Sequence, residues 1–399
     1  MRVLAVTRGV PGCGKSTFIK EHNLEPYTIS ADNIRLLFES PVMDHENGHV
    51  ITSQKNDKRV WELVFKLLEE RMDRGEFCII DATHSKSQDF AKYKKLIEKY
   101  RYRAFCIDFS DIDIETCKKQ NSLREDYKKV PEYVIENLYS RITTQDVPNY
   151  FKKIHYKDEK AINSAFSVYE PSDVNNYEKV VCFGDIHGCY EPLAEYFKNN
   201  PFSDNNLYIF TGDYLDRGIQ GKEVIEFLLD KYLMPNVWIL QGNHEKHFIE
   251  YANGEYDEEI KIGVKNKCRS AEFFNNTIKQ IEQFDKKDLR ELARRFRQLA
   301  FIKFNNKRFF ITHAGVGYLP DDIIKTSANT YIRSNGKYED PIDEWFEKNE
   351  GKRNPDLYQI HAHRNINDIA MHPFEHSFNL CDKVEFGGNL RILELIKEQ

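Results

Sequence analysis

The sequence predicts an α/β protein with two domains, and three observations carry this prediction. The chain has 399 residues, about twice the usual length of one domain. Its first part alternates between short β-type runs and helical patterns, which is typical of a parallel sheet with flanking helices. A second series of β-type runs begins at residue 179, and several of these runs end in Asp or His. We therefore expect a parallel-sheet domain followed by a second α/β domain.

Composition excludes two classes of protein. Hydrophobic residues make up 40% of the chain and charged residues 31%, so the chain is too rich in core-forming side chains to be disordered. The mean hydropathy of -0.65 is too polar for an integral membrane protein, and no apolar run approaches the roughly 20 residues that span a bilayer. The eight cysteines include no C-x-x-C pair and are expected to be reduced. We expect a cytoplasmic protein with no membrane partner.

The elements of the first domain follow from its apolar runs. Helical periodicity predicts helices near 55–73 and 88–100. Residues 115–142 have the pattern of a helix, a basic loop and a second helix that begins after Pro131, and such a hairpin could close over the sheet as a lid. We place this domain at 1–150. Strands are predicted from the runs RVLAVTRG, YTIS, FCIID and AFCIDF, at residues 2–9, 27–30, 77–81 and 104–109.

The second domain has its own order of strands. Residues 151–176 are polar, weakly periodic and punctuated by proline, which predicts a linker. Within residues 177–399, a mostly helical segment near 247–300 has the length of an insertion. The β-type runs around it predict an α/β sandwich. These runs are KVVCFGDIHG, NLYIFTGDYLDRG, NVWILQGNHE, RFFITHAG, YQIHAHRN and LRILELI.

A phosphate-binding motif follows the first predicted strand. Residues 9–16, GVPGCGKS, fit the pattern G-x-x-x-x-G-K-[ST] between a strand and a helix, which is the context that this motif requires. Its glycines let backbone N–H groups point at an oxyanion, while Lys15 meets the outer phosphates and Ser16 can ligate Mg²⁺. An accidental glycine-rich turn is the alternative. The motif predicts an ATP and Mg²⁺ site formed by Gly9, Gly12, Cys13, Gly14, Lys15, Ser16 and Thr17.

Four further residues of the first domain are candidates for phosphoryl transfer. Asp32 could take a proton from an attacking alcohol, and Arg35, one helical turn later, could hold a phosphate of the acceptor. The alternative for this pair is a helix N-cap and a surface arginine. Asp81, at the end of the FCIID run, is either a site carboxylate or a helix cap. Arg124, in the predicted lid, could stabilise charge on the transferred phosphoryl group.

Together these motifs resemble the kinase domain of phage and bacterial polynucleotide 5′-kinases. The resemblance rests on GVPGCGKST, SADNIR, IIDATH and NSLRE, within residues 1–150. It implies that Asp32 is the general base, that Arg35 holds the acceptor phosphate, that Asp81 is an essential site carboxylate and that Arg124 is the lid arginine. Only the phosphate-binding loop is distinctive by itself, because many small-molecule kinases share the rest of this layout.

The second half contains oxygen and nitrogen ligands that mostly follow predicted strands. Because strand ends can converge on one crevice, we expect these side chains to meet. Two divalent cations about 4 Å apart need a bridging carboxylate with terminal His, Asp and Asn ligands, and no thiolate is needed. One histidine alone is more often a packed or surface residue, but five motifs in this order favour a metal site. The motifs are Asp185-Ile186-His187, Gly212-Asp213-Tyr214-Leu215-Asp216-Arg217, Gly242-Asn243-His244-Glu245, His313 and His363.

These five motifs resemble the binuclear metallophosphoesterases, in particular the branch with the protein serine/threonine phosphatases. The resemblance covers most of the second half and implies two divalent cations, which we expect to be Mn²⁺. It also implies that His244, oriented by Asp216, protonates the leaving oxygen and that Arg217 grips the substrate phosphate. The implied metal ligands are Asp185 and His187 for the first cation, Asp213 as the bridge, and Asn243, His313 and His363 for the second cation.

Two departures from the family pattern affect this assignment. The last histidine lies in His361-Ala362-His363-Arg364 rather than in a G-H motif, and we choose His363 over His361 because it follows Ala362. Bacterial polynucleotide phosphatases carry an aspartate before a Gly-Gly pair, where the run NLCDKVEFGG has Cys381 or Asp382. The second departure bears on phosphodiesterase activity and substrate choice rather than on the metal cluster.

The order of the two halves resembles bacterial end-healing polynucleotide kinase-phosphatases without their ligase module. We expect ATP-dependent phosphorylation of 5′-OH polynucleotide ends together with metal-dependent removal of 3′ or 2′,3′ phosphates. RNA ends are favoured over DNA ends, a separate ligase is the expected partner, and a homo-oligomer is compatible with the sequence. The alternative is a small-molecule kinase fused to a phosphoprotein or dinucleoside-polyphosphate phosphatase. A nucleotide sensor with inactive sites is disfavoured because each expected reactive residue is present.

Overall fold

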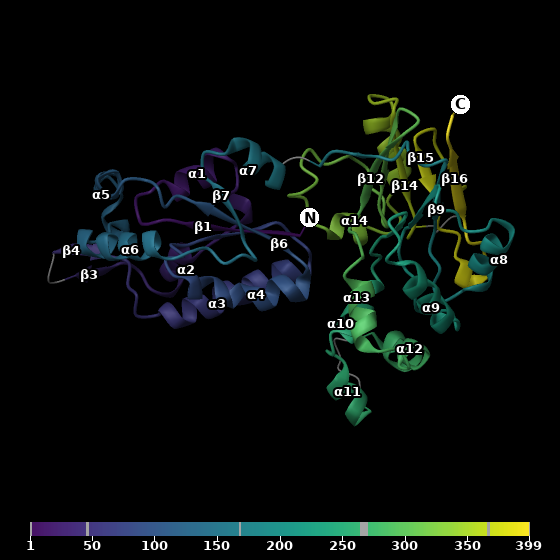
Figure 1. Ribbon diagram of the computed structural model, residues 1–399, viewed down its shortest axis with the longest axis horizontal. Helices are drawn as coiled ribbons and strands as arrows, with labels where there is room; N and C mark the ends of the chain where they lie inside the picture. Colours follow the sequence, from purple (N-terminus) through teal and green to yellow (C-terminus); the bar gives the residue numbers. More distant parts are fainter. Residues whose placement is uncertain (1, 45–47, 167–168, 264–269, 365–367, 399) are drawn as a thin grey trace. The chain divides into compact units, whose positions relative to one another are not determined.

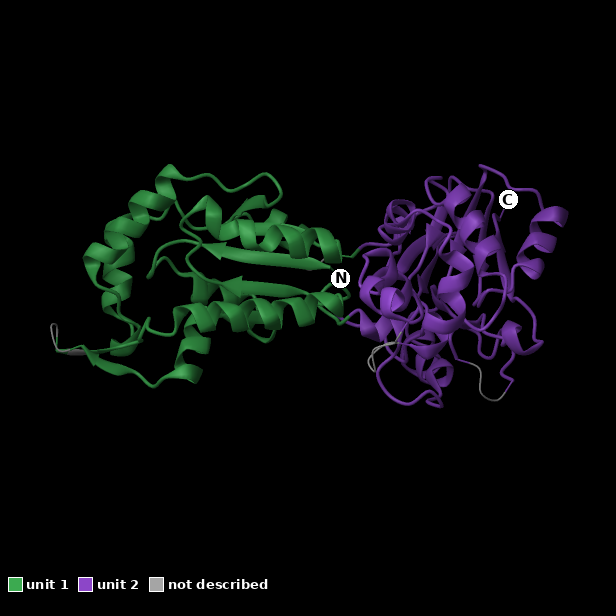
Figure 2. Cartoon of the chain, turned by 90° about the horizontal axis from the view of Figure 1, so that it is seen from below, with its two compact units in different colours: residues 1–169, 322–327 green, residues 170–321, 328–399 purple. Residues whose placement is uncertain are grey.

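The computed structural model divides the chain into two compact units, which Figure 2 distinguishes by colour. The structure describes residues 2–44, 48–166, 169–263, 270–364 and 368–398. Each unit combines sheets with helices, so the predicted α/β class is confirmed. Unit 1 consists of residues 1–169 and 322–327, and unit 2 of residues 170–321 and 328–399.

Unit 1 is built on a five-stranded sheet with the strand order β2-β5-β1-β6-β7. Every neighbouring pair in this sheet is parallel. The parallel arrangement that the alternation of runs predicted is therefore confirmed. The strands are β1 (Val3–Arg8), β2 (Thr28–Ser30), β5 (Cys78–Asp81), β6 (Arg103–Asp108) and β7 (Lys152–His155).

Helices cover both faces of this sheet, because successive residues of a buried strand point to opposite faces and are apolar on both. In β1, Val3 and Ala5 belong to one core, while Leu4 and Val6 belong to the other. Figure 1 shows α1 and α7 on one side of the sheet and α3 and α4 on the other. The first core is covered by α1 (Lys15–Glu21), α5 (Ile114–Ser122), α6 (Glu132–Thr144) and α7 (Glu159–Phe166), and the second by α2 (Ala31–Phe38), α3 (Asp57–Asp73) and α4 (Ser87–Tyr100).

Residues 152–166 do not form the linker that we predicted over 151–176. Instead, β7 pairs with β6, and α7 packs on the first core. Ile154, Ile162 and Phe166 are each at most 3% exposed. The linker prediction was wrong here because a four-residue strand and a short helix carry too few apolar positions to show a period against a polar background.

A two-stranded hairpin in unit 1 was not predicted. It pairs β3 (Val42–Asp44) with β4 (His49–Ile51) in antiparallel fashion. Each strand has only three residues, which is too short to show the alternation that would identify a strand from the sequence. The hairpin follows α2 directly and therefore lies next in the chain to Asp32 and Arg35.

Unit 2 is a sandwich of two sheets around an apolar core, as the sequence predicted. One sheet has the order β11-β10-β9-β16 and the other the order β15-β14-β13-β12-β8. Val180 and Leu207 from the first sheet meet Ile302 and Ile311 from the second in this core. The strands are β9 (Lys179–Phe183), β10 (Asn206–Phe210), β11 (Val237–Ile239) and β16 (Ile392–Ile396) in the first sheet, and β8 (Ser172–Asp173), β12 (Ala300–Phe304), β13 (Lys307–Ile311), β14 (Leu357–His361) and β15 (Ser377–Asn379) in the second.

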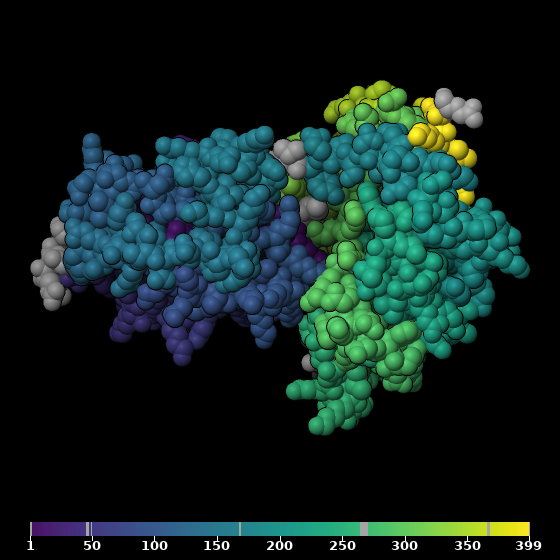
Figure 3. Space-filling model, viewed as in Figure 1, coloured from purple at the N-terminus to yellow at the C-terminus, as the bar shows by residue number. Residues whose placement is uncertain are grey.

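Helices pack on the outer face of the first sheet of unit 2. Val181 and Tyr208 of this sheet share a core with Leu193 of α8 (Glu191–Asn199) and Val224 of α9 (Gly221–Lys231). The helices that follow β11 occupy the stretch where a helical insertion was expected, and they gather at one end of unit 2, away from β15 (Figures 1 and 3). They are α10 (Glu245–Ala252), α11 (Asp257–Ile262), α12 (Ile278–Ile281) and α13 (Lys286–Ala293).

Strand direction brings the predicted ligand loops of unit 2 together. β9, β10 and β11 are parallel neighbours, so the loops after them leave the same edge of the first sheet. β13 and β14 are also parallel neighbours, and His313 and His363 follow them. Loops at the carboxyl ends of neighbouring parallel strands form the usual crevice for ligands in α/β folds.

Two further expectations concern membrane-spanning helices and the state of the cysteine thiols. No described helix combines the length and the apolar character needed to cross a membrane. The seven described cysteines are free thiols, and Cys268 lies outside the described residues. Burial raises the pKa of the Cys78 thiol to about 12, which keeps it protonated and unreactive.

A buried histidine ties β1 of unit 1 to α4. His84 is 4% exposed, and its two ring nitrogens lie 2.7 Å from the Thr7 carbonyl oxygen and 2.9 Å from the Tyr93 hydroxyl. Burial lowers the pKa of His84 to about 4, although the hydrogen bond with Thr7 opposes this shift. His84 therefore remains neutral at physiological pH, as its apolar surroundings require.

We expect His84 to make unit 1 less stable as the pH falls from about 6.5 to about 4. Because the folded pKa of about 4 lies below the ordinary value of 6.5, the unfolded chain binds the proton more readily in this window. The free energy of unfolding should therefore fall by about 3 kcal/mol in total. The measurement is urea unfolding at several pH values, followed by the fluorescence of Trp61 in a chain carrying Trp238→Phe and Trp345→Phe.

The matched variant for this experiment is His84→Gln. Glutamine can still donate to the Thr7 carbonyl but does not titrate, so the free energy of unfolding of the variant should change less between about pH 6.5 and about pH 4. An equal pH dependence in both chains would contradict the role of His84.

Candidate functional site

The phosphate-binding loop of unit 1 runs from the end of β1 to the start of α1. Its lysine is folded back on the loop, because Lys15 Nζ donates to the carbonyl oxygens of Gly9 at 2.8 Å and Val10 at 3.0 Å. Ser16 and Thr17 are exposed beside it. The ammonium group can therefore exchange two neutral carbonyl acceptors for charged phosphate oxygens, which form stronger hydrogen bonds.

Gly12 shows why this loop requires glycine. Its φ is +82°, and a Cβ at this position would lie 2.1 Å from the carbonyl oxygen of Cys117 in α5. Any side chain would therefore separate the loop from the first helix of the predicted lid. Glycine at this position serves the packing of the lid as well as the approach of a phosphate.

Asp81 lies among the other predicted residues of unit 1. It ends β5, and its carboxylate accepts a hydrogen bond from Thr7 Oγ1 at 3.1 Å. Burial raises the pKa of Asp81, while the charges of Lys15 and Arg124 oppose this shift and Asp32 adds to it. Lys15, Asp32 and Arg124 thus each lie within electrostatic range of Asp81. The fold brings together residues from four segments that the sequence identified separately.

Asp32 and Arg35 form an ion pair on α2. Arg35 donates from Nη1 to Asp32 Oδ1 at 2.7 Å and from Nη2 to Asp57 at the start of α3. The N-cap of α2 is Ser30, whose Oγ accepts from Asn33 N, so Asp32 is not the cap. The Asp32 side chain is 68% exposed and that of Arg35 only 11%. An exposed carboxylate beside a fixed guanidinium can take a proton from an alcohol whose phosphate the guanidinium holds.

Arg124 lies in the loop between α5 and α6, and a buried asparagine closes that loop. Asn121 Oδ1 accepts from Val130 N at 3.1 Å, and its Nδ2 donates to Val130 O at 2.8 Å. The backbone N and the hydroxyl of Thr52, just after β4, both donate to Tyr127 O, which joins the hairpin to this loop. We assigned no role to Asn121, which opens the run NSLRE, because the sequence does not show that its side chain bonds to Val130.

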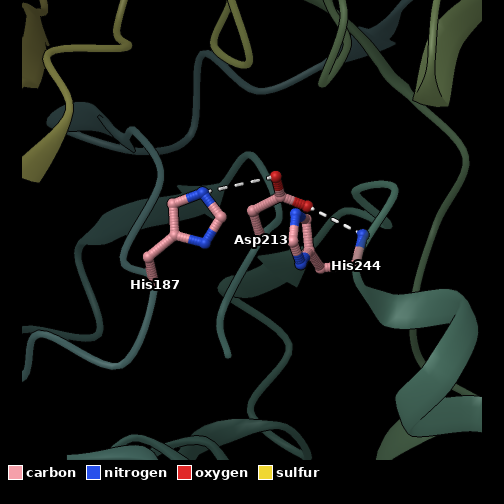
Figure 4. Close-up of side chains that lie close together, drawn as sticks. All are labelled: His187, Asp213 and His244. Atoms are coloured by element: carbon pink, nitrogen blue, oxygen red, sulfur yellow. Dashed lines mark hydrogen bonds and ion pairs between the residues drawn. The ribbon is translucent and has the colours of Figure 1, made fainter. Parts of the chain in front are cut away.

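Asp213 lies at the centre of the site in unit 2 (Figure 4). Its Oδ2 is 3.6 Å from His187 Nε2 and 3.2 Å from His313 Nε2. Its Oδ1 accepts from the backbone N of His244 at 3.1 Å. A carboxylate that lies between two sets of potential metal ligands has the position of a bridging ligand. Among the described residues, two groups that include Asp213 have ligand atoms within 4.8 Å of one another, namely His187, Asp213 and His244, and Asp213, His313 and His363.

The surroundings of Asp185 and His313 test whether cations fit this site. Asp185 is 6% exposed, and its Oδ1 has no hydrogen-bond partner in the part of the chain that the structure describes, although His313 Nδ1 lies 3.6 Å from it. Its Oδ2 accepts from His363 N at 3.0 Å, and Asn243 Oδ1 lies 3.1 Å from His313 Nε2. A buried carboxylate oxygen without a partner is costly unless a cation faces it. The carboxylate, imidazole and carboxamide donors therefore fit two divalent cations, which would supply Lewis acidity when bound.

Several residues of this site hold a left-handed backbone conformation. Their φ values lie between 46° and 71°, a region that costs a non-glycine residue of the order of 1 kcal/mol or more. Such strain persists only where surrounding contacts over-determine the conformation, and it concentrates at functional sites. The strained residues are His187, Asp213, Asp216, Arg217 and His363.

The two candidates for the last metal ligand, His361 at the end of β14 and His363 just after it, have different surroundings. His361 is fully buried, its Nε2 lies 2.8 Å from Asp343 Oδ1, and its Nδ1 lies 3.0 Å from the Ala362 carbonyl oxygen. Both ring nitrogens of His361 therefore have protein partners. The His363 ring instead lies 4.9 Å from the ring of His313, within the second ligand group. This geometry favours His363, the residue that we chose from the sequence.

Cys381, rather than Asp382, faces the metal ligands. Cys381 is buried and shares a hydrogen bond with Asp185, and burial raises the pKa of its thiol, so the thiol is the donor. Asp382 instead pairs with Arg391 at 2.7 Å and accepts from Asn389 N at 3.2 Å. Beside Asp185 this chain therefore has a protonated thiol rather than a carboxylate.

His244 has the surroundings of a general acid. Its Nδ1 lies 2.6 Å from Asp216 Oδ2, and Thr277 donates to the other oxygen of Asp216. Burial alone would lower the pKa of His244, but the hydrogen bond with Asp216 and the charge of Asp213 raise it to about 9. A charged imidazole held through Nδ1 can give the proton of its Nε2 to a leaving oxygen. We did not identify Thr277, which lies in the helical segment more than sixty residues from its partner.

Glu245 holds two ligand loops together, a role that we did not predict. Its Oε2 accepts from Asp213 N at 2.9 Å and from Gly242 N at 2.6 Å, and its Oε1 accepts from Tyr214 N at 3.0 Å. A Cβ at Gly242 would lie 2.3 Å from Asp213 Oδ1, so only glycine allows this approach. The sequence shows Glu245 within the G-N-H-E motif, but its partners become visible only where the loops meet.

The two units match two different families of proteins. Residues 178–387 match the family of calcineurin-like phosphoesterases, and residues 4–144 match an AAA domain family. The first match covers more than half of the chain, so the chain belongs to the calcineurin-like phosphoesterase family. It combines a kinase-like P-loop unit with a metallophosphoesterase unit, a fold that implies divalent metals.

Several curated proteins are similar to part of the chain. Serine/threonine-protein phosphatase 7 of Arabidopsis thaliana is 35% identical over 124 residues, which is 30% of this chain and 30% of that protein. A serine/threonine-protein phosphatase of Encephalitozoon cuniculi, described as probable, is 28% identical over 206 residues, or 48% of this chain and 41% of that protein. The chain thus spans less than half the length of these curated relatives.

Solved structures show only distant likeness. A serine/threonine phosphatase of Saccharomyces cerevisiae covers 52% of this chain and 70% of its own, with 15% identity and a TM-score of 0.35. A chain of the Pnkp1/Rnl/Hen1 RNA repair complex covers 64% of this chain and 85% of its own, with 18% identity and a TM-score of 0.29. Likenesses of this degree do not indicate a substrate.

We expect replacement of His363 to weaken metal binding and replacement of His361 to lower stability. His363→Ala should weaken Mn²⁺ binding by at least about 10-fold, because the second ligand group loses a donor, while the chain stays folded. His361→Ala should retain Mn²⁺ binding but lower the free energy of unfolding by about 1–3 kcal/mol, because Asp343 loses its buried partner. The measurements are calorimetric titration with Mn²⁺ and thermal unfolding in the presence of a chelator.

The Asp343 network provides the control for this pair. Ser377 Oγ also donates to Asp343, so Ser377→Ala should resemble His361→Ala in both measurements. Loss of Mn²⁺ binding in His361→Ala, with normal binding in His363→Ala, would contradict the assignment.

Proposed function

We propose that this protein repairs broken nucleic-acid strands by changing the phosphates at their ends. Unit 1 transfers the γ-phosphoryl group of ATP to a 5′-hydroxyl of a polynucleotide. Unit 2 removes a phosphate from the 3′ end, including a 2′,3′ phosphate. The products, a 5′-phosphate and a 3′-hydroxyl, are those that a separate ligase requires, and we propose RNA ends as the preferred substrate.

The Asp32–Arg35 pair is the observation that carries this proposal for unit 1. Asp32 is exposed beside a guanidinium that both it and Asp57 hold in place. A polynucleotide end presents both groups that such a pair can bind, namely a hydroxyl to deprotonate and a neighbouring backbone phosphate. Lys15 and Arg124 lie within electrostatic range of Asp81 on the same edge, where the phosphates of ATP would bind.

The geometry of unit 2 supports a phosphomonoesterase. Asp213 is shared by two ligand groups, His244 is held through Nδ1 by Asp216, and Arg217 is exposed at the same loop. Asp213 can bind cations, His244 can donate a proton and Arg217 can contact a phosphate. None of these groups recognises the rest of the substrate, which leaves a nucleic-acid 3′ end as compatible as any other phosphomonoester.

The curated relatives favour one alternative for unit 2, a protein phosphatase. The two relatives described above, from Arabidopsis thaliana and Encephalitozoon cuniculi, are named as serine/threonine-protein phosphatases. In this alternative, unit 1 phosphorylates a small molecule and unit 2 acts on phosphoproteins. The two proposals differ in the substrate that each unit accepts, and one set of assays separates them.

We expect Asp32→Ala and His187→Ala to separate the two activities. With labelled ATP and an oligoribonucleotide bearing a 5′-hydroxyl, Asp32→Ala should reduce labelling at least about 100-fold, because the acceptor loses its base. It should leave release of phosphate from a 3′-phosphate oligonucleotide unchanged. His187→Ala should show the reverse, because it removes a metal ligand of unit 2 only.

Parallel arms test the substrate. The same reactions are run with an oligodeoxyribonucleotide, a phosphopeptide and a dinucleoside tetraphosphate. No labelling of any oligonucleotide by the unmutated chain would refute the polynucleotide kinase. Faster release of phosphate from the phosphopeptide than from the 3′-phosphate ends would favour the protein phosphatase.

A further inference from the structure

A buried glutamate lies beside the arginine and a histidine of the site in unit 2. Glu385 belongs to η5 (Val384–Phe386), and its side chain is only 2% exposed. Its Oε1 pairs with Nη1 of Arg217 and is 4.0 Å from Nε2 of His187. Its Oε2 is buried and has no hydrogen-bond partner within the described residues. A covered carboxylate is costly unless charged groups compensate it, which distinguishes this contact from an ordinary surface ion pair.

Arg217 is held at both its backbone and its side chain. Its backbone N donates to Glu272 Oε1 at 2.7 Å, and its φ is 70°. The Arg217 side chain remains 38% exposed although its partner Glu385 is covered. Burial alone would lower the pKa of Arg217, but the hydrogen bond with Glu385 raises it. The guanidinium is therefore charged, held by the buried Glu385 and still partly accessible to solvent.

The ion pair leaves most of the guanidinium available. A guanidinium carries five N–H donors in a rigid fork, and Glu385 accepts from Nη1. No acceptor for Nε or Nη2 of Arg217 is found among the residues that the structure describes. The remaining donors have the planar geometry that binds two phosphate oxygens at once.

Two other roles for Glu385 fit the structure less well. As a metal ligand, Glu385 would belong with His187 and Asp213, but it is in neither of the two groups of potential ligands that the described residues form around Asp213. As a competitor of the substrate, it would have to occupy the exposed side of Arg217, whereas it is covered and Arg217 is not. The covered position points to support of the arginine from the protein side.

We propose that Glu385 is a positioning residue, which fixes the guanidinium of Arg217 in the orientation that binds the phosphate group of the substrate. The inference rests on the proposed phosphatase function of unit 2 and adds a residue that lies in the run NLCDKVEFGG but was given no role from the sequence. A free arginine side chain loses many rotamers when it binds a phosphate. An arginine that Glu385 already holds has lost these rotamers before the substrate binds. Glu385 should therefore increase substrate affinity and have little effect on the rate of bond cleavage.

The test compares Glu385→Leu, Glu385→Gln and the unmutated full chain, with p-nitrophenyl phosphate and Mn²⁺. Glu385→Leu should raise KM about 10-fold, because Arg217 loses its acceptor, and should change kcat less than about 3-fold. The inhibition constant of inorganic phosphate should rise in parallel. Glu385→Gln keeps an acceptor oxygen for Nη1, so it should recover most of the affinity.

Two controls accompany these variants. Asp356→Leu removes a carboxylate from another ion pair of unit 2, with Arg308 at the start of β13, and should leave KM unchanged. In an Arg217→Ala background, Glu385→Leu should cause no further rise in KM, because its effect passes through Arg217. Calorimetric titration with Mn²⁺ should give the same affinity for Glu385→Leu as for the unmutated chain.

Each other outcome overturns the inference. A lower KM in Glu385→Leu would show competition between Glu385 and the substrate, and a loss of Mn²⁺ binding would make Glu385 a metal ligand. An unchanged KM with a lower melting temperature would make its role purely structural. If the unmutated chain hydrolyses p-nitrophenyl phosphate but Glu385→Leu has the same KM, only this inference fails. If the unmutated chain with Mn²⁺ hydrolyses no phosphate ester, the proposed phosphatase fails.

Discussion

The carboxylate of Asp213 is the constraint on which the site of unit 2 depends. Its Oδ2 lies within 3.6 Å of both His187 and His313, so two ligand groups share one side chain. Its position requires a left-handed backbone, support of its N–H by Glu245 and the absence of a side chain at Gly242. The left-handed backbone would be destabilising without such support. Together these features are understandable as the conditions for bringing two ligand groups to one carboxylate.

In unit 1 the carboxyl end of β1 has the corresponding role. Thr7 donates to Asp81 on one side, and its carbonyl binds His84. Arg8 pairs with Asp108 at 3.0 Å in a buried position and donates to the Ile142 carbonyl at 2.7 Å, which ties α6 to the sheet. The phosphate-binding loop therefore starts from a strand whose neighbours on both sides are fixed. The backbone of the loop can hold its shape before any phosphate binds, because the groups around it are already in place.

Much of the fold and of the site could be predicted, and the misses have physical causes. The alternation of apolar runs identified the parallel sheet, and the motifs around Asp213 and His313 identified ligands that the structure brings together. The linker prediction failed because β7 and α7 are too short to show a period. Thr277 and Glu385 were missed because each acts through a partner far away in the chain, and Asn121 was missed because its bonds to Val130 appear only when the loop between them closes.

The sequence by itself determined which chemistry each half carries, because the relevant residues are neighbours in the chain. A loop such as GVPGCGKS has its function in its own backbone, and a run such as GDYLDRG carries ligand types that need no distant information. Only the tertiary structure shows that Asp343 occupies the ring of His361, which favours His363 as the ligand. Only the fold, likewise, covers Glu385 and leaves Arg217 exposed. Burial and hydrogen-bond partners belong to the arrangement of several segments in space, and no single segment of sequence contains them.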